Sequence, residues 1–331
     1  MLTLVTGATG HIGNVLVRKL VEQGKKVRAF YWYRENPLSL SGVDAELFPG
    51  DILDVSLLQK ALEGVDIIYH LAGLISILPN PNSLIWRVNV EGTRNILKLA
   101  QKQGIKRLVY TSSIHALRRI PSGCMIDESI GFDPENPYGE YDRCKAIASL
   151  DVKRAVQEGL DAVIICPTGV IGPYDFFRSE MGALLQGAAQ GQPIFYVDGA
   201  YDFVDVRDVV DGLISAQEAG RTGESYILGG HKVTIKDLIE IVNQITGKYT
   251  LKIRLPLFLA KAIARISPFY ARILKIQPRL TPYSIEVLRS NSDISHLKAT
   301  KELGYNPRPI FETITDTVKW FLEERPRSTK N

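Results

Sequence analysis

The sequence predicts an α/β fold in which a doubly wound parallel sheet is followed by a smaller, mostly helical unit. Short apolar runs alternate with helical patterns through the first half of the chain, as in right-handed βαβ units. Several runs are apolar almost throughout, which is typical of strands buried on both faces. At 331 residues, the chain is long enough for two structural units.

The first half contains six predicted strands, at Leu2–Thr6, Val27–Tyr31, Ala45–Pro49, Ile67–Leu71, Arg107–Thr111 and Ala162–Cys166. Helices are predicted between them at Gly13–Gln23, Val55–Leu62, Asn89–Gln103 and Asp142–Glu158. Gly24, Gly104 and Gly159 come just after three of these helices and predict their C-terminal ends.

The pattern changes after Pro167. Residues 173–200 read as a loop and a helix, Tyr201–Ala216 as a strand entering a helix, and 226–228 as a short strand. The remainder is mostly helical and interrupted by prolines. We therefore expect one domain of residues 1–172 and 201–229 and a second of 173–200 and 230–331. The cleft between them would lie at the carboxyl ends of the strands, where open α/β sheets bind ligands.

The first predicted strand leads directly into three glycines, Gly7, Gly10 and Gly13, and then into a helix. Glycines allow a tight turn and a close approach of a ligand to the backbone, and the free N–H groups of a first helical turn attract anions. The spacing is Gly-x-x-Gly-x-x-Gly. The position between strand and helix predicts a nucleotide site, with a plain βα turn as the alternative.

Composition limits the other classes of function. A net charge of +4 with scattered Lys and Arg gives no electrostatic footprint for nucleic acid. Cys124, Cys144 and Cys166 contain no Cys-x-x-Cys pair. We therefore expect all three to be core residues of a cytoplasmic protein, and we expect no metal site. No apolar run is long enough to span a bilayer. Leu255–Ile276 is apolar and basic, so it is either a domain helix or a helix on a membrane surface.

Tyr141 and Lys145 form a Tyr-x-x-x-Lys pair at the start of a predicted helix. Positions i and i+4 lie on one helical face. A cation one turn away favours the phenolate and would lower the phenol pKa toward neutral pH, as acid–base catalysis requires. The pair therefore predicts a general acid or base at this helix.

Thr111, Ser112 and Ser113 end a predicted strand, so their hydroxyls would enter the cleft. Ser113 could donate a hydrogen bond to a substrate oxygen that gains negative charge. Alone, such a cluster is more typical of a turn or a helix cap.

Together these residues resemble the extended short-chain dehydrogenases/reductases over nearly the whole chain. Thr6 to Gly13 resembles the cofactor loop of that family, and Ser113, Tyr141, Lys145 and Asn89 match its catalytic residues. The resemblance implies a Rossmann-type fold and these cofactor-binding residues: Gly7, Thr9, Gly10, His11, Ile12, Gly13, Arg34, Asp51, Ile52, Leu71, Ala72, Gly73, Tyr141, Lys145, Pro167 and Thr168. Outside the family context, Asp51 would be a turn or cap residue and Asn89 a helix N-cap. We expect structural roles for Asp205 and Asp208, which match a later signature.

The second strand decides the expected cofactor. An acid at its end would bind ribose hydroxyls and select NAD, but the run from Val27 to Arg34 contains none. Arg34 could instead meet the 2′-phosphate of NADP. We therefore expect NADP(H) rather than NAD(H).

The resemblance implies hydride transfer between the nicotinamide and a carbonyl or secondary alcohol. The apolar segment Leu74–Pro79 and the apolar C-terminal tail resemble the dihydroflavonol-4-reductase and 3-beta-hydroxysteroid dehydrogenase branch, and predict a small, largely apolar substrate. A nucleotide-sugar epimerase with retained NAD remains open, and a non-catalytic dinucleotide-binding regulator is the remote alternative. The dehydratase Thr-Asp-Glu is replaced by Ser113-Ile114-His115, with His115 expected to be a spectator. Family members often form homodimers through the helices matching Asn89–Gln103 and Asp142–Glu158.

Overall fold

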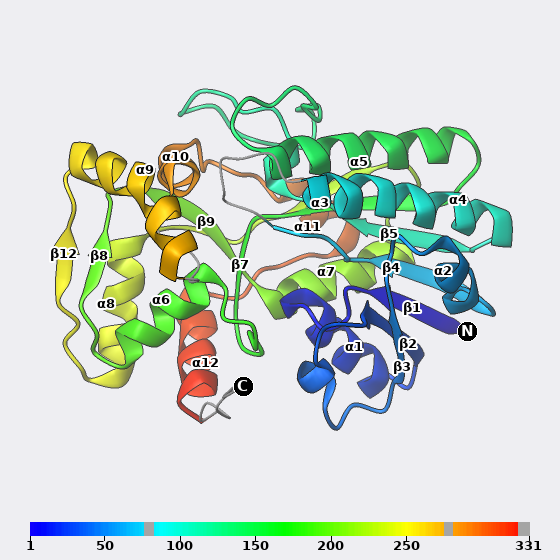
Figure 1. Cartoon of the computed structure of the whole chain (residues 1–331), viewed down its shortest axis with the longest axis horizontal. Coiled ribbons are helices and arrows are strands. Elements are labelled where there is room, and N and C mark those ends of the chain that lie inside the picture. The colour runs from blue at the N-terminus through cyan, green and yellow to red at the C-terminus, as the bar shows by residue number, and fades with distance from the viewer. Residues whose placement is uncertain (76–82, 275–280, 324–331) are drawn as a thin grey trace.

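A seven-stranded parallel sheet forms the centre of the computed structural model, which describes residues 1–75, 83–274 and 281–323. The strand order is β10-β6-β5-β4-β1-β2-β3 (Figure 1). The strands are β1 (Leu2–Thr6), β2 (Lys26–Trp32), β3 (Glu46–Gly50), β4 (Val65–His70), β5 (Arg107–Thr111), β6 (Ala162–Pro167) and β10 (Ser225–Leu228). The predicted doubly wound sheet is confirmed, and each of the six strands predicted in the first half is present with bounds shifted by at most two residues.

Helices cover both faces of this sheet because successive strand residues point to opposite sides. Leu4 and Ile68 belong to the core under α2 (Val55–Ala61), α4 (Thr93–Gln103) and α5 (Glu140–Gln157). Val5 and Tyr69 belong to the core under α1 (His11–Glu22), α7 (Val206–Ala219) and α11 (Leu297–Leu303). The strands are therefore buried on both faces, as their apolar sequences predict.

Smaller sheets and the remaining helices build the other end of the molecule (Figure 1). One sheet has the order β11-β9-β7 and the other pairs β12 with β8. The elements are β7 (Gly169–Ile171), β8 (Ile194–Tyr196), β9 (Ala200–Asp205), β11 (His231–Thr234), β12 (Lys252–Arg254), α6 (Glu180–Ala189), α8 (Ile235–Thr246), α9 (Leu257–Leu274), α10 (Pro282–Arg289) and α12 (Ile310–Glu323). Short 3-10 turns lie at η1 (Pro37–Leu40) and η3 (Ile114–Ala116).

The helix ends agree with the glycine signals. Gly24, Gly104 and Gly159 have φ values of 72°, 66° and 101°, a left-handed conformation that a glycine adopts without a Cβ penalty. Each of these residues follows a helix and ends it.

The helix predicted to begin at Asn89 begins earlier, and Asn89 is not its N-cap. Helix α3 (Ser83–Trp86) runs into the π-helical segment η2 (Arg87–Gly92), which continues as α4. Asn89 lies inside η2 and is buried. The prediction failed because the residues before Asn89 are themselves helical, and the wide π turn aims the Asn89 amide at the loop after β4 instead of at the helix backbone.

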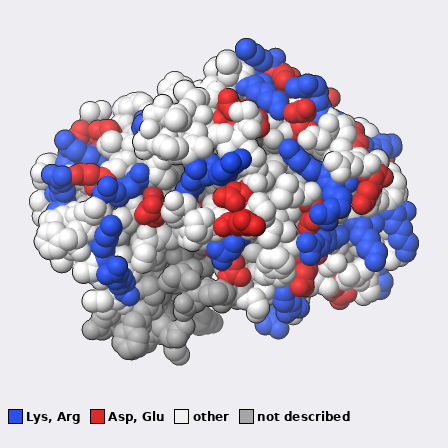
Figure 2. Space-filling view, turned by 90° about the horizontal axis from the view of Figure 1, so that it is seen from above, with Lys and Arg blue, Asp and Glu red and all other residues white. Residues whose placement is uncertain are grey.

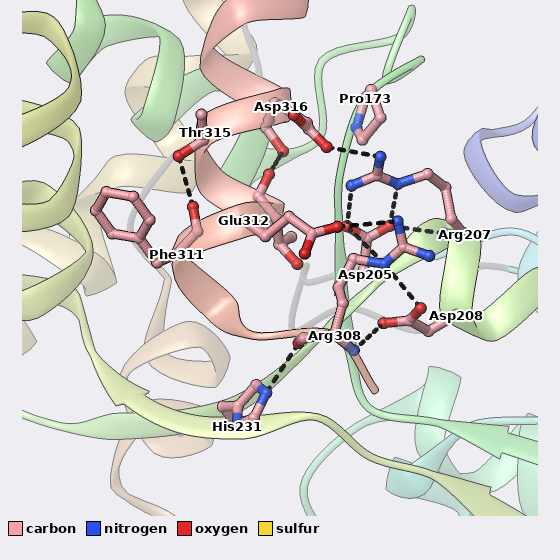
Figure 3. Close-up of polar contacts among 12 residues, drawn as sticks. Pro173, Asp205, Arg207, Asp208, His231, Arg308, Phe311, Glu312, Thr315 and Asp316 are labelled. Carbon is pink, nitrogen blue, oxygen red and sulfur yellow. Dashed lines mark hydrogen bonds and ion pairs between the residues drawn. The ribbon is translucent and has the colours of Figure 1, made fainter. Parts of the chain in front are cut away.

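Asp205 and Asp208 lie in an ion-pair network that joins the start of α7 to the C-terminal segment (Figure 3). Asp205 binds Arg207 with both oxygens, at 3.0 and 2.8 Å. Asp208 accepts from the backbone N–H and the Nε of Arg308, both at 2.8 Å. Arg207 also reaches Asp316 of α12 at 2.7 Å. The expected structural roles of the two aspartates are confirmed.

The cysteines are free, and the expectation of three core residues is wrong for Cys124, which is exposed in a surface loop. Cys144 and Cys166 are buried. Within the described ranges, no helix is long and apolar enough to cross a membrane, and no group of His, Cys, Asp and Glu side chains could hold a metal ion. On the face shown in Figure 2, Lys and Arg are interspersed with Asp and Glu.

Candidate active site

The turn between β1 and α1 has the geometry of a phosphate cradle. Gly7 has φ 67°, and a Cβ there would lie 2.8 Å from the backbone nitrogen of Ala72. A Cβ on Gly13 would lie 2.1 Å from the Gly7 carbonyl oxygen. Gly10 is the N-cap of α1, and no side chain caps the helix there. The first backbone N–H groups of the helix therefore lack a side-chain acceptor. The cradle fits the pyrophosphate of a dinucleotide.

The loop after β4 lies against this cradle. The Leu71 and Ala72 backbone N–H groups each donate to the Thr6 hydroxyl at 3.2 Å. On the other side, the Nε2 of His11 lies 3.0 Å from the Pro173 carbonyl oxygen. Ile12 packs against the core under α1. The predicted loop residues therefore surround one crevice at the carboxyl ends of the strands.

Gly73, Asn89 and Lys145 converge beside the crevice. A Cβ on Gly73 would lie 2.9 Å from the Oδ1 of Asn89 and 3.4 Å from the Nζ of Lys145. Asn89 is held by Leu74, whose backbone N–H donates to its Oδ1 and whose carbonyl accepts from its Nδ2, both at 2.8 Å. A glycine is needed at position 73 because a side chain there would displace the amide or the ammonium.

Tyr141 and Ser113 meet at the end of β5. Ser113 is the N-cap of η3, with its Oγ accepting from the His115 backbone N–H at 3.2 Å. Its hydroxyl is close enough to the phenol of Tyr141 to lower the Tyr141 pKa. Burial outweighs this effect and raises the pKa of Tyr141 above its ordinary value of 10. Both side chains are buried, so the structure brings together the two hydroxyls that the sequence analysis paired, and their role as donors stays a prediction.

The i,i+4 spacing predicts that Lys145 lowers the pKa of Tyr141, whereas burial raises that pKa. The Nζ of Lys145 donates to the Thr111 carbonyl oxygen at 2.7 Å and lies 5.1 Å from the centre of the Tyr110 ring. Burial lowers the pKa of Lys145 from 10.5 to about 8. The ammonium is held at the end of β5, where the Thr111 carbonyl accepts its hydrogen bond.

The other predicted cofactor residues occupy different surroundings. Asp51 forms a turn in which its Oδ1 accepts from the Leu53 backbone N–H at 2.9 Å, while Asp54 caps α2. Ile52 packs against Gly92, where a Cβ would lie 2.7 Å from it. Pro167 ends β6, and the Thr168 hydroxyl donates to Asp202 at 2.6 Å. Among the described residues, no hydrogen bond joins these side chains to Tyr141.

The sequence reading missed Glu35. The prediction counted acids only as far as Arg34, and the next residue is an acid whose carboxylate accepts a hydrogen bond from the Thr9 hydroxyl of the glycine turn. Arg34 instead stacks on Trp32 and Tyr33, with its guanidinium carbon 5.7 and 5.4 Å from their ring centres. A search for acids that continued one residue beyond Arg34 would have found Glu35.

Asp142, which directly follows Tyr141, was not among the predicted site residues. Asp142 is fully buried, and it accepts from the Tyr283 hydroxyl at 2.6 Å and from Arg119 at 3.4 Å. The Tyr201 hydroxyl is 2.8 Å from the Nε2 of His115, whose ring stacks on Tyr201. Burial lowers the pKa of His115, so its neutral form is favoured at pH 7.

Comparison with known proteins agrees with this geometry. The model of the NAD dependent epimerase/dehydratase family matches residues 3–229. Sterol demethylase protein B of Methylococcus capsulatus is 36% identical, with 98% of this chain and 99% of that protein covered. A putative dihydroflavonol 4-reductase of Synechocystis is 33% identical, covering 96% and 93%. A 3 beta-hydroxysteroid dehydrogenase/Delta 5-->4-isomerase of Mycobacterium tuberculosis is 28% identical, covering 96% and 90%.

The crystal structure of gox2253 superposes with a TM-score of 0.83 at 34% identity, covering 97% of this chain and 98% of the other. The likeness spans both the seven-stranded sheet and the C-terminal part. The chain therefore belongs to the NAD-dependent epimerase/dehydratase family, the extended short-chain dehydrogenases/reductases, and is an NAD(P)-dependent oxidoreductase of that type.

Proposed function

We propose that the protein transfers a hydride between a nicotinamide dinucleotide and the carbonyl or secondary alcohol of a small, largely apolar substrate. The observation that carries the proposal is the pair of buried hydroxyl side chains Ser113 and Tyr141, set near Lys145 and Asn89 at the carboxyl end of the sheet. The sterol and dihydroflavonol names of the relatives support an apolar substrate.

The cofactor supplies or accepts the hydride when it is bound. The glycine turn would hold its pyrophosphate, and Lys145, with Asn89 beside it, would hold the ribose next to the nicotinamide. In the reducing direction, the Oη of Tyr141 gives its proton to the carbonyl oxygen while the Oγ of Ser113 donates a hydrogen bond to the same oxygen. We assign residues 1–172 and 201–229 to dinucleotide binding and residues 173–200 and 230–331 to substrate binding.

Replacing the proton donor tests this assignment. Tyr141→Phe is expected to lower turnover by roughly 10²–10⁴, the range for general acid–base catalysis, while the cofactor dissociation constant stays within about twofold. The readout is NADPH or NADH consumption with a panel of cyclic ketones. Tyr226→Phe is the matched control, since that phenol bonds to Glu302 outside the crevice. Unchanged turnover in Tyr141→Phe would refute the assignment.

An epimerase would use the same hydroxyl pair and keep its cofactor through purification. The purified protein would then contain bound NAD and interconvert UDP-sugars without net redox change. A non-catalytic regulator would bind the cofactor and turn over neither class of substrate. The absence of NADPH consumption with every ketone, together with bound NAD, would favour the epimerase.

The preference for NADP(H) rests on Arg34, and one observation favours NAD(H) as a second candidate. The carboxylate of Glu35 lies at the glycine turn, where an acid would bind the ribose hydroxyls and repel a 2′-phosphate. Under the NADP(H) proposal, Arg34→Glu weakens NADPH binding more than NADH binding in fluorescence titrations. If Glu35→Gln instead weakens NADH and Arg34→Glu affects both cofactors equally, NAD(H) is the cofactor.

We also propose a cytoplasmic homodimer that buries α4 and α5. These helices lie side by side and share the ion pair between Arg94 and Asp151, at 2.7 Å. Sedimentation equilibrium gives the mass directly, and a monomer at micromolar concentration would reject the dimer.

A further inference from the structure

A cavity of about 200 Å³ lies between the segment that follows β5 and the end of α10. It is smaller than the roughly 300 Å³ at which sites for whole drug-sized ligands begin, so it suits one end of a substrate. One part of its lining is aliphatic, made by Ile114, Leu117, Ile120, Pro121, Ile126 and Ile294. Such a wall favours an apolar ring or chain.

The cavity adjoins the Ser113–Tyr141 pair. Ile114 and His115, the two residues directly after Ser113, both line it. Tyr201 lines it as well and holds the His115 ring at 2.8 Å. A molecule whose reacting oxygen lies at Ser113 would therefore extend into this cavity.

The polar part of the lining is positively charged. Arg118, Arg119 and Arg289 line the cavity, and Glu286 is the acid among the described lining residues. In the part of the chain that the structure describes, neither Arg118 nor Arg289 has an acidic partner. Three arginines and one acid among the described lining residues give the lining an excess of positive charge.

Two contacts hold the guanidinium of Arg119, and one of its nitrogens has no hydrogen-bond partner among the described residues. Its Nη2 donates to the buried Asp142 at 3.4 Å, and its guanidinium lies over the Tyr138 ring, 3.9 Å from the ring centre. Its Nη1 is buried and has no hydrogen-bond partner among the described residues. A buried donor without a partner is unfavourable, so Arg119 gains if a side-chain movement brings this nitrogen to an acceptor.

We propose that this cavity is an anion subsite, in which Arg118, Arg119 and Arg289 bind a carboxylate carried by an otherwise apolar substrate. The substrate class is therefore a hydroxy or keto acid with an aliphatic or ring skeleton. The proposal rests on the proposed function for the position of the reacting carbon. Arginine suits the role because its planar fork matches the two carboxylate oxygens.

Equilibrium binding tests the subsite without turnover. The probes are 2-naphthoate and its neutral counterpart 2-naphthamide, measured by isothermal titration calorimetry with the full-length protein. We expect the wild type to bind the acid at least about tenfold more tightly than the amide. Arg118→Gln and Arg289→Gln should each weaken naphthoate binding about three- to tenfold and leave naphthamide binding unchanged.

Arg119→Lys keeps a charge beside Asp142 but removes the fork, so it should weaken naphthoate binding without unfolding the protein. Arg265→Gln is the matched control, because Arg265 is an exposed arginine on α9 outside the cavity. Equal affinity for the acid and the amide in the wild type would overturn the proposal. So would unchanged naphthoate binding in Arg118→Gln and Arg289→Gln together.

Failure of this proposal is distinguishable from failure of the proposed function. Tyr141→Phe should keep the preference for naphthoate, since Tyr141 is not among the residues that line the cavity. If that variant also keeps full turnover, the proposed chemistry fails while the anion subsite stands. If the arginine variants bind both probes like the wild type and Tyr141→Phe is inactive, the subsite fails while the chemistry stands.

Discussion

Replacing Lys145 by methionine should stabilise the protein in the absence of cofactor while abolishing turnover. Burial lowers the pKa of Lys145 from 10.5 to about 8, and each pKa unit corresponds to 1.36 kcal/mol, so keeping the ammonium charged costs about 3 kcal/mol. Removing this cost stabilises the variant. The variant also loses the 2.7 Å hydrogen bond to the Thr111 carbonyl, which destabilises it by about 1–2 kcal/mol. A net gain of about 1–2 kcal/mol remains.

The measurement is thermal and urea unfolding of Lys145→Met and the wild type across pH. At neutral pH the Tm should rise by roughly 2–8 °C. Below pH 8 both states of the wild type hold the Lys145 proton, so the destabilisation is present in full. Between pH 8 and 10.5 the unfolded state binds the proton that the folded state has released, so wild-type stability rises with pH. The advantage of the variant therefore shrinks through this window and reverses above it, where only the lost hydrogen bond to Thr111 remains.

Lys301→Met, at an exposed position on α11, is the control and should show no such pH dependence. A variant less stable than the wild type at pH 7 would refute the reasoning. So would a stability difference that stays constant from pH 7 to 10.5, because the burial of the charge would then not be its source.

Two other substitutions test the turn and the C-terminal network. Gly13→Ala places a Cβ 2.1 Å from the Gly7 carbonyl oxygen, so the turn must open. We expect cofactor binding to be at least about tenfold weaker by calorimetry. Unchanged affinity would show that the turn does not hold the cofactor. Arg308→Ala leaves the buried Asp208 carboxylate without its guanidinium partner and should lower the free energy of unfolding by about 2–4 kcal/mol in urea titrations. A loss below about 1 kcal/mol would show that the network does not stabilise the fold.

The elements that were predicted well are those with a recognisable pattern in the local sequence. The strand Leu2–Thr6 is a short apolar run that ends in glycines, and its bounds agree with β1. The Tyr-x-x-x-Lys pair is set by helical spacing alone. By contrast, β7 spans only Gly169–Ile171 and is defined by its neighbour β9, so no local pattern announces it.

The rest of the site depends on contacts between distant segments. Arg118 and Arg289 line one cavity although most of the chain between them builds other elements. The hydrogen bond from Lys145 to Thr111 depends on how α5 settles against β5, which helical spacing does not encode. The predicted substrate-facing segment Leu74–Pro79 lies partly outside the described residues, and so does the end of Leu255–Ile276.

On the ribosome, β6 leaves the exit tunnel well before β10, since one strand ends at Pro167 and the other begins at Ser225. At roughly 5–20 residues per second, the delay is about 3–12 s. During this interval the outer edge of β6, which is buried along its whole length in the finished molecule, has no strand to pair with. An unpaired apolar edge is a template for association with other nascent chains. Slow translation between these two strands would therefore lower the yield of folded protein, and a chaperone that covers the edge would restore it.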